Sequence, residues 1–148
     1  MYEELNFDSI NTIYDRMLSS SEEKETSLLI LTDVGAVLKN KELGEKLRQI
    51  IYNRRHLNCH IVVLLQSYLS IPNQVRKMIT NCFMFKPSKT EFENFCNELF
   101  ETKKYMAWEI IKVAYFEPKD HPYIMLNAET QKMYRKFDEI IIHEGKSN

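Results

Sequence analysis

The best candidates for chemistry in this sequence are polar residues that directly follow two apolar runs. Thr32 and Asp33 follow the run 28–31, and Gln66 follows the run 61–65. Short apolar runs bounded by polar residues are typical of strands buried on both faces of a parallel sheet. In such sheets, ligands bind beyond the carboxyl ends of the strands. Asp33 therefore stands where a metal ligand or a general base is expected.

A helix is predicted between these two strands, which fixes how they pair. Asn40 can cap it, and apolar residues with helical spacing continue to about residue 57. A strand, a helix and a strand in this order predict a right-handed crossover with parallel pairing. The other expected elements are a helix (2–18), a polar loop (19–26), a short helix (73–80), a third parallel strand (82–85), a helix capped by Ser88 and Glu91, a segment ambiguous between helix and strand (105–116), a strand (123–127) and its hairpin partner or a terminal turn (133–138).

Composition predicts one ordinary globular domain. The chain has 148 residues, of which 44% are hydrophobic and 28% are charged, and it contains no apolar run long enough to span a membrane. Its three cysteines are widely spaced, which suits a reducing compartment better than a disulfide framework or a zinc site. The net charge of −1 conceals a basic block, because residues 34–89 carry 10 basic and 2 acidic side chains. Such a block attracts the phosphates of a nucleotide or of DNA, or is simply a solvated lysine-rich face.

Several stretches together resemble the poxvirus-type genome-packaging ATPases of large DNA viruses, in the FtsK/HerA branch of the P-loop NTPases. The stretches that carry the resemblance are Leu28 to Val34, Ile50 to Leu57, Val63 to Tyr68 with Ile71-Pro72 and Val75 to Lys77, Phe85 to Lys89, and Tyr134 to Asp138. The resemblance implies an α/β fold, a partial RecA/FtsK-like parallel sheet with flanking helices. It also implies ATP and Mg²⁺ as cofactors, DNA as a partner, and ATP-driven movement of DNA into a capsid.

The sequence departs from the family pattern at two points. A phosphate-binding loop needs the spacing Gly-x-x-x-x-Gly-Lys-Ser/Thr, and Gly35, Gly44 and Gly145 do not provide it. We therefore expect the first strand and the phosphate loop of the family to be missing. The family also carries two adjacent acids after the strand, whereas this chain has Thr32 followed by Asp33. A hydroxyl is a much poorer ligand for Mg²⁺ than a carboxylate, which leaves Asp33 as the metal candidate. The resemblance also implies that Asp33 is the water-polarising acid.

The same resemblance assigns further roles. It makes Gln66 the γ-phosphate sensor, and Arg54 or Arg55 the arginine finger that reaches a neighbouring subunit's nucleotide. Arg76 and Lys77 become phosphate or DNA contacts. Structural alternatives stay open for each residue. Asp33 could form a strand-end turn, Thr32 and Gln66 could bond to nearby backbone, and the paired arginines could favour the dipole of a helix end. Tyr52 and Tyr68 could stack on bases, although buried tyrosines are the simpler expectation.

We predict a single domain, residues 1–148, with an N-terminal helix and loop (1–26) and a core (27–140). The expected function is that of a packaging ATPase in truncated, split or degenerate form, inactive alone. The alternative is a non-enzymatic nucleic-acid-binding or assembly subunit. If a central strand is missing, the sheet has an open edge, which predicts a homo-oligomer or a complementing subunit that bears the phosphate loop. The expected location is the host cytoplasm, in a viral factory, or the virion.

Overall fold

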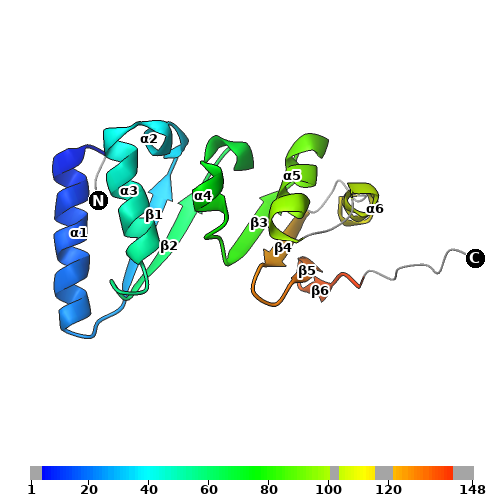
Figure 1. Cartoon of the computed structure of the whole chain (residues 1–148). Coiled ribbons are helices and arrows are strands. Elements are labelled where there is room, and N and C mark those ends of the chain that lie inside the picture. Colours follow the sequence, from blue (N-terminus) through cyan, green and yellow to red (C-terminus); the bar gives the residue numbers. More distant parts are fainter. Residues whose placement is uncertain (1–4, 101–103, 116–121, 142–148) are drawn as a thin grey trace, which may run out of the picture. The chain divides into compact units, whose positions relative to one another are not determined.

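The computed structural model describes residues 5–100, 104–115 and 122–141. The chain divides into two compact units, Met1–Met78 and Ile79–Asn148 (Figure 1). None of the described helices is long and apolar enough to cross a lipid bilayer.

Unit 1 is built around a parallel pair of strands. Its elements are α1 (Phe7–Glu22), β1 (Ser27–Thr32), α2 (Gly35–Lys39), α3 (Glu42–Asn53), β2 (Cys59–Leu64), the 3-10 turn η1 (Tyr68–Ser70) and α4 (Asn73–Arg76). The strands β1 and β2 pair in parallel from Ser27 opposite Cys59 to Thr32 opposite Leu64. The predicted strand–helix–strand crossover is therefore confirmed.

Local capping determines where the helices of unit 1 begin. Asn6 and Ser9 form a reciprocal capping box, so α1 starts at Phe7. Residues 2–4, where the predicted helix began, lie outside the described residues. The helix continues to Glu22, so the loop predicted from residue 19 was wrong for residues 19–22. Ser19, Ser20 and Ser21 lie at exposed or half-buried positions, and the buried residues Ile10, Ile13 and Met17 hold the helix in place. The side chain of Asn40 accepts hydrogen bonds from the backbone of Glu42 and Leu43, which confirms its predicted capping role.

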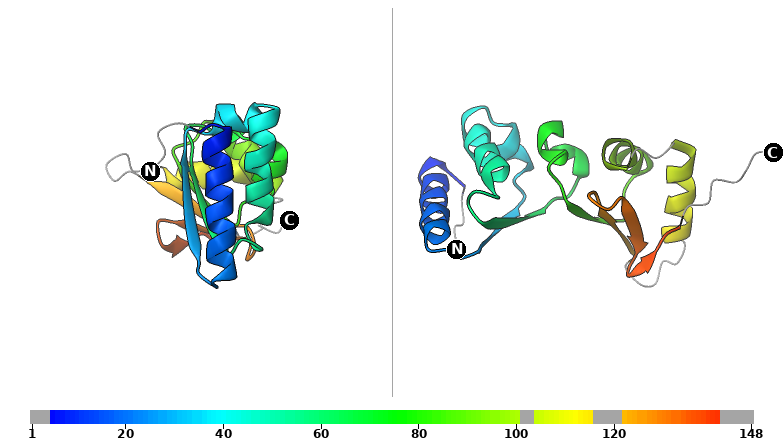
Figure 2. Two further views of the ribbon diagram at one scale, coloured as in Figure 1. Left: turned by 90° about the vertical axis from the view of Figure 1, so that its left-hand side faces the viewer. Right: turned by 60° about the horizontal axis from the view of Figure 1, so that its bottom comes forward.

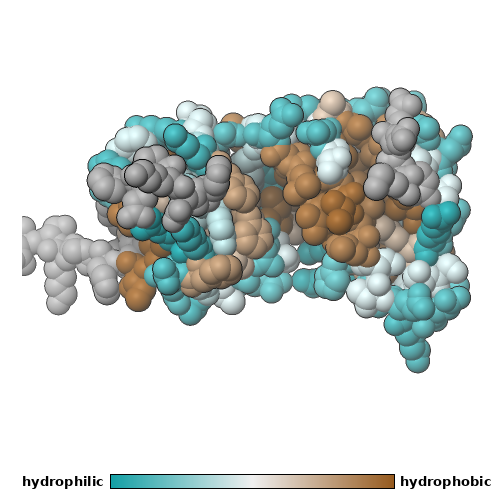
Figure 3. All heavy atoms as spheres, turned by 180° about the vertical axis from the view of Figure 1, so that it is seen from behind, coloured by the Kyte–Doolittle hydropathy of each residue, from teal (hydrophilic) through white to brown (hydrophobic). Residues whose placement is uncertain are grey.

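Only one face of the β1–β2 pair is covered within unit 1, so the prediction of strands buried on both faces is wrong. Helices α1 and α3 lie side by side against one face, where Leu31 is buried (Figures 1 and 2). On the other face the side chains alternate outward, and Leu28 and Ile30 remain 62% and 57% exposed. Val62 and Leu64 of β2 are also exposed. Figure 3, which shows the molecule from behind, contains a broad hydrophobic area on its surface.

Unit 2 is an antiparallel sheet with two helices. Its elements are β3 (Asn81–Phe85), α5 (Lys89–Leu99), α6 (Lys104–Ala114), β4 (Tyr123–Asn127), β5 (Lys132–Arg135) and β6 (Asp138–Glu139), and the strand order is β3-β4-β5-β6. The third strand exists as predicted, but its described ladder is antiparallel, with β4, so its assignment as a parallel strand was wrong. The segment that was ambiguous between helix and strand is helical up to Ala114, and β5 is the hairpin partner of β4.

The core of unit 2 follows the predicted helix stripe. Ser88 and Glu91 form the expected capping box at the start of α5. Phe92, Phe95 and Cys96 on this helix are fully buried, as predicted for the core. The strands contribute Ile124, Leu126 and Met133 to the buried residues, which lie at alternate positions along β4 and on its partner β5.

Candidate functional site

The turn after β1 holds the candidate acid in an unusual backbone conformation. Asp33 has a φ of 53°, in the left-handed region that Asp tolerates better than most residues. Its backbone N–H donates to the carbonyl of Leu64 at 3.2 Å, so the ladder with β2 extends one residue past Thr32. The side chains of Thr32 and Asp33 are exposed, while Val34 is buried and anchors the turn. The carboxylate is thus carried on a fixed turn and is open to a ligand.

The segment after β2 packs closely against this turn. Gln66 is exposed, and Ser70 donates through both its backbone N–H and its hydroxyl to the carbonyl of Ser67. A Cβ atom placed on Gly35 would lie 2.9 Å from the Cβ and from the Oγ of Ser70, closer than real Cβ atoms approach. The glycine therefore lets the two strand-end segments touch. No signal in the sequence points to Ser70 as the neighbour of Gly35.

The residues at the carboxyl ends of the two strands, Thr32, Asp33 and Gln66, lie at the same end of the β1–β2 pair, because the strands are parallel and in register. One exposed carboxylate beside hydroxyl and amide groups can polarise a water molecule. It can also bind a hydrated cation that is shared with phosphate oxygens. The described residues contain no cluster of three or more His, Cys, Asp or Glu side chains able to hold a metal ion by themselves.

The two candidate arginine fingers lie at the opposite end of the strands. Arg54 and Arg55 follow the last residue of α3 and precede the first residue of β2. Six residues of strand, at about 3.3 Å each, separate the ends of β2 by about 20 Å. Arg54 bonds weakly to the carbonyl of Ile51, at 3.5 Å. Neither arginine can therefore reach a phosphate held near Asp33 of its own chain.

The side chain of Arg76 makes contacts within the segment that carries it. Its guanidinium donates to the carbonyl of Ile71 at 2.8 Å and lies over the ring of Tyr68, 5.2 Å from the centroid. Tyr68 is buried, which confirms the expectation of a buried or half-buried tyrosine, whereas Tyr52 is exposed and the same expectation is wrong there. Lys77 is exposed next to Arg76. Of the two predicted phosphate contacts, Lys77 is thus the more accessible.

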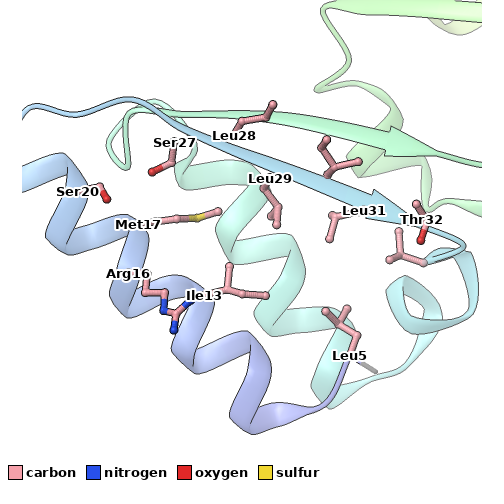
Figure 4. A pocket seen from close by; sticks show the side chains of 12 residues that line it. Leu5, Ile13, Arg16, Met17, Ser20, Ser27, Leu28, Leu29, Leu31 and Thr32 are labelled. Atoms are coloured by element: carbon pink, nitrogen blue, oxygen red, sulfur yellow. The ribbon is translucent and has the colours of Figure 1, made fainter. Parts of the chain in front are cut away.

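A groove of about 700 Å³ runs along unit 1 between α1 and β1 (Figure 4). From α1 it is lined by Ile13, Arg16 and Met17, and from β1 by residues along the whole strand. Leu29 and Leu31 point toward the helices, whereas Leu28 points away from them. The groove was not predicted from the sequence. Its position along β1 depends on the order of the strands in the sheet, which the local sequence pattern does not reveal.

A mixed α/β fold with a parallel strand pair, an acid after one strand and an amide after the next is the arrangement that the resemblance to P-loop NTPases predicts. Residues 4–133 match the family described as Poxvirus A32 protein. The chain therefore belongs to this family. A comparison with curated proteins found no match.

Solved structures of packaging ATPases share the fold. B204, the DNA-packaging ATPase from Sulfolobus turreted icosahedral virus, superposes with a TM-score of 0.68 at 15% identity, covering 96% of this chain and 65% of B204. The genome packaging NTPase B204 from Sulfolobus turreted icosahedral virus 2 is similar in complex with AMP (TM-score 0.66, 15% identity, 95% and 66% covered). It is also similar in complex with ATP-gammaS (TM-score 0.67, 14% identity, 96% and 66% covered). This chain therefore spans about two thirds of the length of these proteins.

Proposed function

We propose that this chain supplies the strand-end half of a viral packaging ATPase site, in which Asp33 polarises the attacking water and Gln66 senses the γ-phosphate. The observation that carries the proposal is the in-register parallel pairing of β1 and β2, together with the close approach of Gly35 to Ser70. These features keep the two strand-end segments together without a ligand. The left-handed turn at Asp33 also fixes the backbone from which the carboxylate extends.

The other half of the site is a phosphate-binding loop, and the 148 residues do not contain its glycine spacing. The chain alone therefore does not hydrolyse ATP. Mg²⁺ is typically held by one or two carboxylates, water and phosphate oxygens, so the single exposed Asp33 fits that ion only once a nucleotide is bound. The ion would supply charge neutralisation at the phosphates, while Asp33 and Gln66 orient water.

Nucleotide, DNA and other subunits are the partners we propose. The B204 relatives were solved with AMP and ATP-gammaS, which supports nucleotide as the ligand class. The distance of Arg54 and Arg55 from Asp33 supports a role across a subunit boundary in an oligomer. The exposed Lys77 and the basic block 34–89 support contact with DNA. The same block is what favours the second candidate, a nucleic-acid-binding or assembly subunit that has no enzymatic role.

A phosphate-release assay tests the proposal. The chain is incubated with ATP, Mg²⁺ and double-stranded DNA, and Asp33→Asn serves as the matched variant. We expect no release above a protein-free control. Release that Asp33→Asn abolishes would contradict inactivity but support the site, and release that this variant leaves unchanged would contradict the site. DNA binding without nucleotide, with affinity falling steeply with salt, would favour the second candidate.

A further inference from the structure

One face of the antiparallel sheet in unit 2 is rich in aromatic side chains. Phe85 lies opposite Tyr123 in the β3–β4 ladder, and residues directly opposite each other project from the same face. Side chains alternate along a strand, so Phe83 is on this face too, and Tyr134 of β5 joins it through the pair that it forms with Met125. The buried side chains of these strands lie on the other face and are Met84, Ile124, Leu126 and Met133. The aromatic face of unit 2 is defined by Phe83, Phe85, Tyr123 and Tyr134.

The rings on this face form a row. The ring centroid of Tyr123 lies 5.6 Å from that of Phe85 and 5.9 Å from that of Phe83. Despite these contacts, Phe83 and Phe85 remain 55% and 65% exposed. Their Cα atoms are about 7 Å apart, because each residue of an antiparallel strand advances by about 3.4 Å. The two phenyl rings are thus steadied by Tyr123 between them and are still open to a flat ligand.

The aromatic composition of the face indicates the ligand. The exposed face of the β1–β2 pair carries aliphatic side chains such as Leu28 and Ile30, which bury apolar area but cannot stack. Aromatic rings do stack on the faces of nucleic-acid bases, and rings on open antiparallel sheets are a recurrent way of binding unpaired bases. The bases of a duplex already stack on one another. The aromatic face therefore suits a single strand.

The charges around the row suit a phosphate backbone. Lys86 directly follows β3 at one end of the row, and Lys132 lies on the aromatic face at the other end. The backbone N–H of Lys136 donates to the carbonyl of Tyr123, so a third lysine lies beside the row. Among the residues of the described strands on this face, Glu139 is the only acidic one, and it pairs with Lys132 at 3.0 Å. Phosphates on either side of stacked bases would meet cations, whereas a second copy would bring lysines against lysines.

We infer that the aromatic face of unit 2 is a binding platform for single-stranded DNA. Bases stack on the exposed phenyl rings, and the backbone phosphates lie near Lys86 and Lys132. The inference rests on the proposed function in one respect, which is that the nucleic acid is DNA. The DNA contact proposed at Lys77 is electrostatic and accepts DNA in either form. The aromatic face adds a site that distinguishes unpaired bases from paired ones.

Fluorescence anisotropy tests the platform with the full chain. The probe is an end-labelled oligodeoxythymidylate about 15 nucleotides long, a length within the site sizes of single-strand-binding domains. A duplex of the same length and an oligouridylate of the same length are the comparison ligands, and no nucleotide is added. We expect the single-stranded DNA to bind at least 10-fold more tightly than the duplex. NMR should show the largest amide shifts on adding this DNA in β3 and β4.

Variants of Phe85 separate stacking from general apolar contact. Phe85→Leu keeps an apolar side chain without a ring, whereas Phe85→Tyr keeps the ring. One stacked base contributes about 5- to 150-fold in affinity, so Phe85→Leu should weaken single-strand binding at least 5-fold and Phe85→Tyr less than 2-fold. Phe7→Leu, at an exposed phenylalanine of unit 1, is the matched control and should change nothing. If Phe85→Leu does not fold, Phe83→Leu takes its place.

Four outcomes would overturn the inference. Phe85→Leu could bind as tightly as the unaltered chain, or the duplex as tightly as the single strand, and either would leave no role for stacking. Tighter binding of the oligouridylate would reassign the face to RNA. Amide shifts in β3 and β4 that depend on protein concentration without DNA would make a second copy the occupant.

Failure of this inference is distinguishable from failure of the proposed function. Duplex binding that Lys77→Ala weakens, together with single-strand binding that Phe85→Leu leaves unchanged, would support the proposed DNA contact and reject the aromatic platform. The titration contains no ATP, so its result leaves the phosphate-release assay and the role of Asp33 unaffected, and the reverse also holds.

Discussion

Replacing Gly35 with alanine tests whether contact between the two strand-end segments organises the candidate site. The new Cβ would lie 2.9 Å from the Cβ and the Oγ of Ser70, so one of the two segments must move. Overpacking of this kind costs about 1–3 kcal/mol. Alanine recovers up to about 1 kcal/mol, because Gly35 is a helical residue of α2. We therefore expect Gly35→Ala to destabilise unit 1 by about 1–2 kcal/mol.

A double-mutant cycle tests whether the clash with Ser70 causes the loss of stability in Gly35→Ala. Ser70→Gly removes both close atoms and leaves only the Ser70 carbonyl oxygen, at an ordinary 3.5 Å from the new Cβ. The combination Gly35→Ala with Ser70→Gly should therefore be more stable than the sum of the single changes, by about 1 kcal/mol or more. Ser70→Ala is the matched control, because it removes the hydroxyl but keeps the Cβ, and it should rescue less.

The assay is urea denaturation followed by far-ultraviolet circular dichroism, with hydrogen exchange at the Asp33 amide as a local readout. This amide donates to Leu64, so a displaced turn should exchange faster. Effects of Gly35→Ala and Ser70→Gly that add within about 0.5 kcal/mol would refute the reasoning, since they would show that the two segments are not in contact.

Three further predictions concern stability. Phe92→Ala removes a fully buried ring from unit 2 and should lower the free energy of unfolding by about 3–5 kcal/mol. The measurement is denaturant unfolding followed by the fluorescence of Trp108, which lies in the same unit. An unchanged unfolding midpoint would contradict the core described. Burial raises the pKa of the Cys82 and Cys96 thiols from 9.0 to about 12, so they keep their protons when unfolded thiols have lost theirs. Unit 2 should therefore lose stability as pH rises above about 9, in the same fluorescence assay, and Cys96→Ala should reduce the dependence. Asn40→Ala should lower the free energy of unfolding by about 1 kcal/mol, because two backbone N–H groups lose their acceptor. Asn40→Asp should lower it much less, and denaturation followed by circular dichroism measures both.

The sequence was sufficient for the parts of the fold that depend on local pattern. The apolar runs at 28–31 and 61–65 and the helix between them predicted the parallel pair. Asn40, Ser88 and Glu91 predicted caps that the structure contains, because a cap depends on residues within one helical turn.

Features that depend on distant segments were not predictable in the same way. An apolar run does not reveal whether a second layer covers it, so the exposure of Leu28 and Ile30 was missed. The pairing of β3 with β4 joins segments about 40 residues apart, and periodicity contains no information on that choice. The position of Arg54 and Arg55 at the far end of β2 follows from chain order once the strands are known to be parallel, and it makes a role within one subunit untenable.

Titration of the chain with Mg²⁺ and ATP-gammaS, followed by NMR, tests the central claim most directly. The claim is that Asp33 and Gln66 form the strand-end half of a nucleotide site whose phosphate-binding half is not in these 148 residues. The account predicts binding weaker than about 1 mM, with amide shifts largest at Asp33, Gly35, Gln66 and Ser67. Micromolar binding, or shifts centred in unit 2, would contradict it.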